Sequence, residues 1–154
     1  MKIKRILSLF IILLATTIAL SACTGGRRIV ASGWAGVTTD DDTAYLAYNT
    51  HVYAIDLANG NERWRYPQEA DPKITFYSAP ALTSDGQLIV GGYNNTLYSL
   101  NPENGQVNWQ FEGAEGRYIG GPLVTEQGIF APNTDQNVYA IGFDQQPLWD
   151  QPFP

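Results

Sequence analysis

The stretch Tyr98–Trp109, YSLNPENGQVNW, decides the fold because its arrangement recurs along the chain. The same order of tyrosine, turn and tryptophan occurs at Tyr53–Trp64, YAIDLANGNERW, and a looser copy occurs at Tyr139–Trp149, YAIGFDQQPLW. In the first two copies an Asn-Gly pair, ending at Gly60 or Gly105, separates two apolar runs, which is a hairpin signal. Three copies of one hairpin predict a repeat protein built from strands.

The repeat extends well beyond the hairpin. Residues 33–66 align with residues 78–111 without a gap at an offset of 45, and a third copy begins near Gly120. The shared residues outside the hairpin include Thr38/Thr83, Asp40/Asp85, Tyr48/Tyr93 and Asn49/Asn94. In the third copy the offset falls to between 42 and 40, as expected when loops shorten and strands do not. A period of 40–45 residues predicts β-propeller blades.

Four strand-like runs are clearest in the middle copy. They are short, bounded by turn residues and free of a helical apolar spacing, and they cover residues 78–83, 87–92, 96–100 and 106–111. The continuous apolar run QLIVGG at 87–92 is typical of a strand that is buried on both faces.

The two-residue period of a strand predicts which side chains share a face. Tyr98 and Leu100 are expected on one face of their strand. On the next strand, Val107, Trp109 and Phe111 are expected to share a face.

The pattern Tyr-Ala-Ile-Asp-x-x-x-Gly-x-x-x-Trp resembles the repeat of the pyrroloquinoline-quinone-like β-propellers. That repeat occurs in quinoprotein alcohol dehydrogenases and in the propeller lipoprotein of the outer-membrane β-barrel assembly machinery. The resemblance covers residues 33–150 and implies an all-β fold of four-stranded antiparallel blades. The blades are expected at about 33–66, 78–111 and 120–154, within a partial propeller that spans 33–154.

The resemblance is specific for fold and unspecific for function. Its repeat positions are packing residues in every branch of the family, and here they are Tyr53, Gly60, Trp64, Tyr98, Gly105, Trp109, Tyr139 and Trp149. Three blades form an incomplete ring, because propellers typically use 4–8 blades. Two interpretations stay open. The chain is the N-terminal part of a longer protein, or it assembles with further copies into a closed ring.

The N-terminus carries a targeting signal. A basic start precedes an apolar run from Ile6 to Leu20, which predicts a hydrophobic signal helix and a signal peptide over residues 1–22. The following LSAC resembles the bacterial lipobox and identifies Cys23 as the lipidation site; the alternative is a small buried cysteine in an uncleaved helix. Residues 23–32 are expected to form a flexible tether. We therefore expect an exported protein, anchored in the membrane through lipidated Cys23 at the periplasmic or extracytoplasmic face of the cell envelope.

Charge and composition exclude some partners. Residues 23–154 hold six basic and fifteen acidic residues, a net charge of −9, whereas a nucleic-acid partner would require a basic surface. Cys23 is the one cysteine, so neither an intramolecular disulfide nor a cysteine-rich metal site can form.

Residues that could carry chemistry have simpler interpretations. The run TTDDD, residues 38–42, lacks the alternate spacing of an EF-hand loop and is expected to be a turn. His51 is the one histidine and is expected to be an exposed turn residue, and Trp34 is expected to cap the propeller start. We therefore predict no catalytic, cofactor-binding or metal-binding residue, and no cofactor.

The residues favour a non-enzymatic scaffold for envelope proteins, with outer-membrane protein assembly as the instance that the resemblance suggests. One alternative is a truncated quinoprotein-type dehydrogenase. Such enzymes use adjacent disulfide-bonded cysteines, a tryptophan stacked on the cofactor and calcium-binding residues, and no such set can be transferred to this chain. A further alternative is an extracytoplasmic sensor or a polysaccharide-binding propeller.

Overall fold

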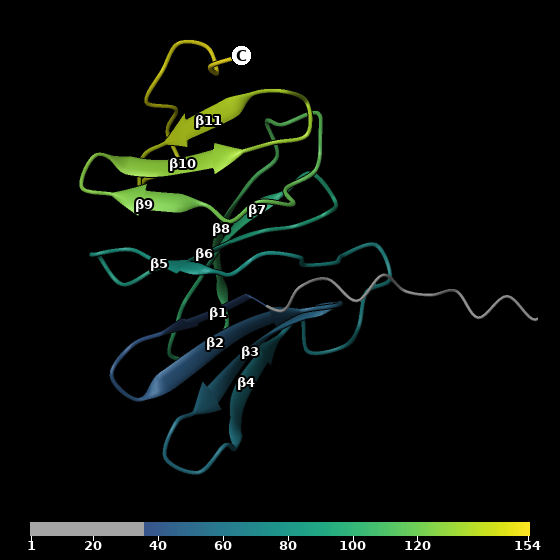
Figure 1. Cartoon of the computed structure of the whole chain (residues 1–154), viewed down its shortest axis with the longest axis vertical. Coiled ribbons are helices and arrows are strands. Elements are labelled where there is room, and N and C mark those ends of the chain that lie inside the picture. Colours follow the sequence, from purple (N-terminus) through teal and green to yellow (C-terminus); the bar gives the residue numbers. More distant parts are fainter. Residues whose placement is uncertain (1–35) are drawn as a thin grey trace, which may run out of the picture. The chain divides into compact units, whose positions relative to one another are not determined.

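A computed structural model describes residues 36–154 as three antiparallel sheets that follow one another in chain order (Figure 1). The signal segment, Cys23, the tether and Trp34 lie outside the described residues. The first blade contains β1 (Gly36–Thr39), β2 (Thr43–Tyr48), β3 (His51–Asp56) and β4 (Glu62–Tyr66). The second contains β5 (Ala81–Leu82), β6 (Leu88–Gly91), β7 (Leu97–Leu100) and β8 (Val107–Phe111). The third contains β9 (Leu123–Thr125), β10 (Gly128–Pro132) and β11 (Val138–Ile141).

The first two blades are four-stranded antiparallel meanders, which confirms the all-β fold and the predicted blade pattern. The turns that precede β4 and β8 have the same construction. Gly60 and Gly105 take φ values of 74° and 72°, which are open to glycine at little cost. The side chains of Asp56 and Asn101 each accept a hydrogen bond from a backbone N–H two residues later in the turn. Within the described residues, no helix is long and apolar enough to span a membrane.

The core lies between the blades. One cluster of buried side chains joins the first and second blades and contains Tyr45, Ala47, Val52, Ala54, Trp64, Phe76, Leu88, Val90, Tyr98 and Leu100. A second cluster joins the second and third blades and contains Ile89, Leu97, Ala114, Tyr118, Ile129, Ala131, Tyr139 and Ile141. Every residue of β6 is buried, as the continuous apolar run predicted, and every residue of β7 is buried as well. The expectation that Tyr98 and Leu100 share a face is also confirmed.

The gapless alignment of the first two copies is wrong in the second strand. Tyr53 pairs with Leu46 across β3 and β2, and Tyr98 pairs with Val90 across β7 and β6. The two tyrosines are 45 residues apart, whereas Leu46 and Val90 are 44 apart. Leu46 is therefore the structural counterpart of Val90.

A longer turn in the second blade causes this shift. In the first blade Tyr48 pairs directly with His51, which leaves two residues in the turn. In the second blade the N–H of Gly92 donates to the carbonyl of Thr96 (2.8 Å), which leaves three. Tyr93 therefore lies in the turn and is not the counterpart of Tyr48, although both are tyrosines.

The prediction that Val107 shares a face with Trp109 is wrong. Trp109 pairs with Ser99 and Val107 pairs with Leu100, so Asn108 is an extra residue in β8. Such a β-bulge reverses the alternation of side chains along one strand. As a result, Val107 packs against the cluster between the first two blades, and Trp109 packs against the cluster between the last two.

The third blade lacks the predicted fourth strand. The segment that carries Trp149 makes two isolated bridges to β11, one between Pro147 and Ile141 and one between Phe153 and Val138. Between these bridges residues 149–152 leave the sheet edge. Prolines at 147, 152 and 154 have no N–H to donate, so a regular ladder cannot form along this segment.

Candidate protein-interaction surface

The repeat tyrosines and tryptophans face opposite neighbours. The ring of Tyr98 packs against Tyr66 of the preceding blade at 5.6 Å, and the ring of Tyr139 packs against Phe111 of its preceding blade at 5.6 Å. Trp64 faces the following blade and is 6% exposed. These three side chains therefore join the blades.

Each interface also contains a hydrogen bond from an indole. Trp64 Nε1 donates to the carbonyl of Pro102 in the next blade (2.8 Å). At the next interface Trp109 Nε1 donates to Gln87 Oε1 (2.8 Å), and Gln87 Nε2 donates to the carbonyl of Phe143 (3.0 Å). Pro102 and Phe143 hold the same repeat position. Both indoles are therefore linked to the same carbonyl position of the next blade, Trp64 directly and Trp109 through the side-chain amide of Gln87.

The repeat residues of the terminal blades lie in other surroundings. Tyr53 is half-buried, and the guanidinium of Arg65 lies 5.4 Å from the centre of its ring. A Cβ atom at Gly60 would meet nothing within 4 Å. Trp149 is 41% exposed, and its ring lies 5.6 Å from that of Phe130.

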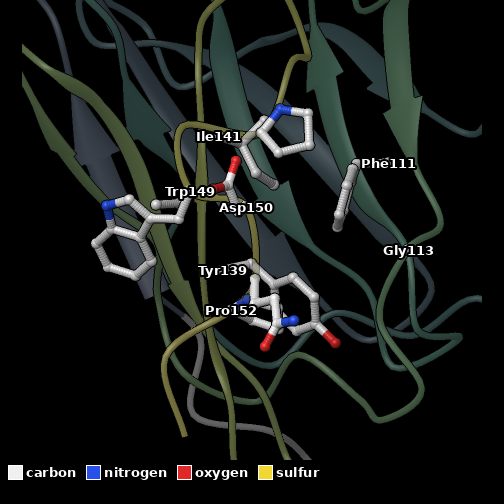
Figure 2. A pocket seen from close by; sticks show the side chains of 10 residues that line it. Phe111, Gly113, Tyr139, Ile141, Trp149, Asp150 and Pro152 are labelled. Carbon is white, nitrogen blue, oxygen red and sulfur yellow. The ribbon is translucent and has the colours of Figure 1, made fainter.

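An apolar groove of about 260 Å³ lies where the fourth strand of the third blade is missing (Figure 2). Phe111, Tyr139 and Ile141 line it, together with Pro147 and residues 149–152. Figure 2 shows the indole of Trp149 directed away from the rings of Phe111 and Tyr139. Asp150 is the one carboxylate that lines the groove, which therefore offers shape and apolar contact rather than a catalytic pair.

The TTDDD run forms the turn between β1 and β2 only with residues 40–42, because Thr38 and Thr39 still belong to β1. Asp40 caps this turn by accepting hydrogen bonds from the N–H of Thr43 (2.9 Å) and from the hydroxyl of Tyr45 (2.7 Å). Burial, and then the adjacent Asp40 carboxylate, raises the pKa of Tyr45 to about 12. Within residues 36–154 there is no cluster of three or more His, Cys, Asp and Glu side chains suited to a metal ion.

The side chain of Arg63 lies at the same end of the first blade as the β1–β2 turn. It forms ion pairs with Asp42 (3.0 Å) and Asp56 (2.8 Å). The hydrogen bonds from Arg63 hold the pKa values of both carboxyl groups below their ordinary range. These groups stabilise each other, and they do not form an acid–base pair.

His51 begins β3 rather than lying in the preceding turn, and it is half-buried. Its Nδ1 lies 3.0 Å from the hydroxyl of Thr50, and its ring lies 5.4 Å from that of Tyr53. Desolvation, and then the charge of Arg65, lowers the pKa of His51.

A different set of side chains forms the strongest candidate for contact with another protein. The rings of Tyr77 and Tyr93 lie 5.0 Å apart, and the guanidinium of Arg117 lies 4.2 Å from the centre of the Tyr93 ring. Arg117 Nη1 also donates to the Tyr93 hydroxyl (2.7 Å). Ile119, 55% exposed, follows Arg117 in the same connection. We call Tyr77, Tyr93, Arg117 and Ile119 the tyrosine–arginine surface.

Hydrogen bonds from two blades hold this surface in place. The side chain of Asn95, in the β6–β7 turn, donates to the carbonyl of Glu115 (2.8 Å). Thr134, in the β10–β11 turn, accepts from the N–H of Arg117 at its hydroxyl (2.7 Å) and donates with its own N–H to the Arg117 carbonyl (3.0 Å). The connection before β9 is thereby fixed to both neighbouring turns.

Sequence reasoning missed the tyrosine–arginine surface. Its members come from three connections that lie between the strands, so no periodic pattern links them. The available signal is compositional, because Tyr77 and Tyr93 are large aromatic residues in segments that the repeat assigns to connections and turns.

The sheet order, the packing tyrosines and the indole hydrogen bonds define a β-propeller of the pyrroloquinoline-quinone-like repeat class. Residues 49–151 match the model of the family described as outer membrane protein assembly factor BamB. This match covers more than half of the chain, and the chain belongs to that family.

Solved structures show the same fold. BamB from Moraxella catarrhalis is similar with a TM-score of 0.61 and 18% identity, over 76% of this chain and 35% of that one. The quinohemoprotein alcohol dehydrogenase from Comamonas testosteroni is similar with a TM-score of 0.63 and 21% identity, over 77% of this chain and 21% of that one. The computationally designed Ika8 protein gives a TM-score of 0.52 and 17% identity, over 66% of this chain and 30% of that one.

The chain therefore spans about a third or less of the length of each of these structures. No curated protein sequence matches it significantly. One of these similar structures is a quinohemoprotein alcohol dehydrogenase, so we compared the tryptophans and the cysteine of this chain with those that a quinone site requires. Trp64 and Trp109 are engaged between blades, and the sequence has one cysteine where such enzymes use an adjacent pair. The described residues do not fit a quinone–calcium site.

Proposed function

We propose that the chain is a non-enzymatic scaffold that binds other proteins of the cell envelope, and that it serves outer-membrane protein assembly. The tyrosine–arginine surface carries this proposal. Tyrosine and arginine are enriched at the centres of protein interfaces, because both combine a large contact area with hydrogen-bond donors.

The support beneath the surface favours binding over a merely structural role. Side chains that are already ordered lose less conformational entropy when a partner binds. Arg117 is held between Tyr93 and Thr134, so its position is set before any contact forms. In a chain with a formal net charge of −6, Arg117 also offers a local positive group to a partner's carboxylate or carbonyl.

Site-specific photocrosslinking in intact cells tests this proposal. A photoreactive phenylalanine derivative at position 77 should crosslink to an envelope protein, and Arg117→Ala should reduce that product about tenfold, which corresponds to about 1.4 kcal/mol. The matched control places the probe at Leu57, which is 52% exposed in the β3–β4 turn at the other end of the strands. Equal labelling from both positions, or none from position 77, would refute the assignment.

The membrane anchor is a separate part of the proposal. A lipidated Cys23 would keep the surface near the membrane where barrel proteins are assembled. Metabolic labelling with palmitate should mark the wild-type chain and fail with Cys23→Ala. Labelling that survives this substitution would rule out the tether.

The absence of enzymatic activity can be tested directly. Titration with pyrroloquinoline quinone and calcium should give no binding. Calcium-dependent quinone binding would instead support the dehydrogenase alternative.

A further inference from the structure

The carboxylate of Asp135, in the β10–β11 turn, holds three separate parts of the chain. Its Oδ2 accepts hydrogen bonds from the hydroxyl of Tyr139 (2.7 Å) and from the N–H of Glu115 (3.1 Å). Its Oδ1 accepts from the N–H of Asn137 in its own turn (3.0 Å). One half-buried carboxylate therefore links a repeat tyrosine, a turn and the connection before β9.

Glu115 lies two residues before Arg117 of the tyrosine–arginine surface. Its N–H is held by Asp135 in the third blade, and its carbonyl accepts from the side chain of Asn95 in the second blade (2.8 Å). Because peptide groups are planar, bonds to the groups on both sides of the Glu115 Cα fix the backbone at that residue. They thereby set the direction in which the chain continues to Arg117.

The next residue, Gly116, lies directly against the same turn. Its carbonyl accepts a hydrogen bond from the side chain of Asn133 (3.0 Å). A Cβ atom at Gly116 would lie 2.5 Å from the backbone nitrogen of Asp135, so a larger residue would displace the connection. The connection is therefore seated closely on the turn that carries Asp135.

The second blade lacks this charged support. The β6–β7 and β10–β11 turns each contain three residues, and Asn94 holds the repeat position of Asp135. Asn94 Nδ2 donates to the hydroxyl of Tyr98 (2.7 Å), and within residues 36–154 its side chain makes no hydrogen bond to the connection before β5. The carboxylate is therefore present in the turn whose connection carries Arg117.

We propose that Asp135 is the positioning residue of the tyrosine–arginine surface, and that its negative charge orders this surface before a partner binds. This inference rests on the proposed function. Hydrogen bonds to a charged acceptor are stronger than those to a neutral one. Loss of the charge weakens the support of the Glu115 N–H and leaves Tyr77, Tyr93 and Arg117 in place. Binding must then order the connection, which costs affinity.

The charge of Asp135 gives the proposal a dependence on pH. Burial raises the pKa of Asp135, but the hydrogen bonds from Tyr139 and from backbone N–H groups outweigh it and hold this pKa below its ordinary value. The other titratable groups around it are Tyr139 on β11, and Tyr118 and Glu115 on the connection. Burial raises the pKa of both tyrosines, so they keep their protons in acid. The support from Asp135 is therefore present above the unfolded pKa near 4 and is lost as the pH falls through the folded value.

Hydrogen exchange of the purified full chain in detergent, measured by NMR, tests the positioning. Asp135→Asn keeps the shape of the side chain and should lower the protection factor of the Glu115 N–H about tenfold. The wild-type chain should show the same loss below about pH 4, and Asp135→Asn should show no such step. Asp144→Asn is the matched control, because Asp144 accepts from the N–H of Gln146 in its own turn (3.1 Å), and it should leave the Glu115 N–H protected.

Photocrosslinking from position 77 in intact cells relates the positioning to binding. Asp135→Asn should reduce the crosslinked product about fivefold, and Asp144→Asn should leave it unchanged. Gly116→Ala displaces the connection and keeps the charge of Asp135, so it is an independent test and should also reduce the product. Far-UV circular dichroism of the purified variants checks their folding.

The outcomes separate this inference from the proposed function. A wild-type chain that gives no crosslink would remove the proposed function and this inference with it. A wild-type crosslink that either Asp135→Asn or Gly116→Ala leaves unchanged would overturn the role of Asp135 alone. An unchanged protection factor at Glu115, or an equal loss in Asp144→Asn, would overturn it as well.

Discussion

The middle blade and the first blade share one repeat but differ in the burial of their strands. All residues of β6 and β7 are buried, whereas buried and half-buried residues alternate along β2 and β3. The composition does not explain this difference, because β3 holds the continuous apolar run VYAI at 52–55 much as β6 holds LIV. The difference follows from position, because β6 and β7 pack against a blade on each side within the described residues.

Two turn glycines give the largest expected contrast between these blades. Both have positive φ, so alanine at either position costs about 1 kcal/mol of strain. At Gly105 a Cβ atom would also lie 2.5 Å from Trp64 Cε3, and this overpacking adds about 1–3 kcal/mol. Gly105→Ala should therefore lower the free energy of unfolding by about 2 kcal/mol more than Gly60→Ala, measured by urea denaturation. Equal losses would contradict the contact between the two blades.

Two valines at the same repeat position give the next contrast. Val52 is fully buried between the first two blades, and Val138 is half-buried on the outer side of the third. Val52→Ala removes two buried methyl groups and should cost about 2 kcal/mol, and Val138→Ala should cost less than about 1 kcal/mol. The denaturation midpoints of the two variants test this order, and a reversed order would contradict the assigned faces.

The inserted amide at the second interface gives a smaller effect. Gln87→Ala leaves the indole N–H of Trp109 and the carbonyl of Phe143 without their present partner, at a cost of about 1–2 kcal/mol. Tryptophan fluorescence during urea denaturation would measure this loss in the free energy of unfolding. Gln106→Ala, at an exposed position beside the turn, is the control and should change the stability little. A loss as small as that of the control would show that water replaces the amide.

The smallest effect concerns the surface ion pairs of the first blade. Arg63 lowers the pKa values of Asp42 and Asp56, so the stability that these groups contribute is present above the unfolded pKa near 4. It is lost as the pH falls through the folded values. The difference in melting temperature between wild type and Arg63→Gln should therefore shrink from pH 6 to pH 2. A difference that stays constant across this range would contradict a role for these carboxylates.

The sequence was sufficient to predict the blades, because Tyr98 and Trp109 recur with their turns at a spacing that is typical of few other folds. The sequence was insufficient to place side chains correctly at the two positions where one residue is inserted, the β6–β7 turn and the bulge in β8. The identities Tyr48/Tyr93 and Asn49/Asn94 favoured a gapless alignment, although the longer turn places Tyr93 outside the strand. The bulge at Asn108 could not be recognised from the sequence, because Val107, Trp109 and Phe111 keep the two-residue spacing of a regular strand.

The candidate site was less predictable than the fold. Tyr77, Tyr93 and Arg117 approach one another only because three connections meet at one end of the strands. Such proximity depends on the arrangement of the blades and not on local periodicity. The repeat aromatics, in contrast, were identifiable from spacing alone, and four of them, Trp64, Tyr98, Trp109 and Tyr139, join the described blades.

The amide of Gln87 has a consequence for the curvature of the whole propeller. One hydrogen bond separates the indole of Trp64 from the next blade, whereas two hydrogen bonds and a side chain separate that of Trp109. Because the fourth strand of each blade lies at the rim, we expect the longer link to increase the wedge angle between its two blades. The number of blades in a ring depends on the sum of these angles. A single glutamine in the β5–β6 turn would therefore be a means by which repeats of nearly equal length are fitted to rings of different size.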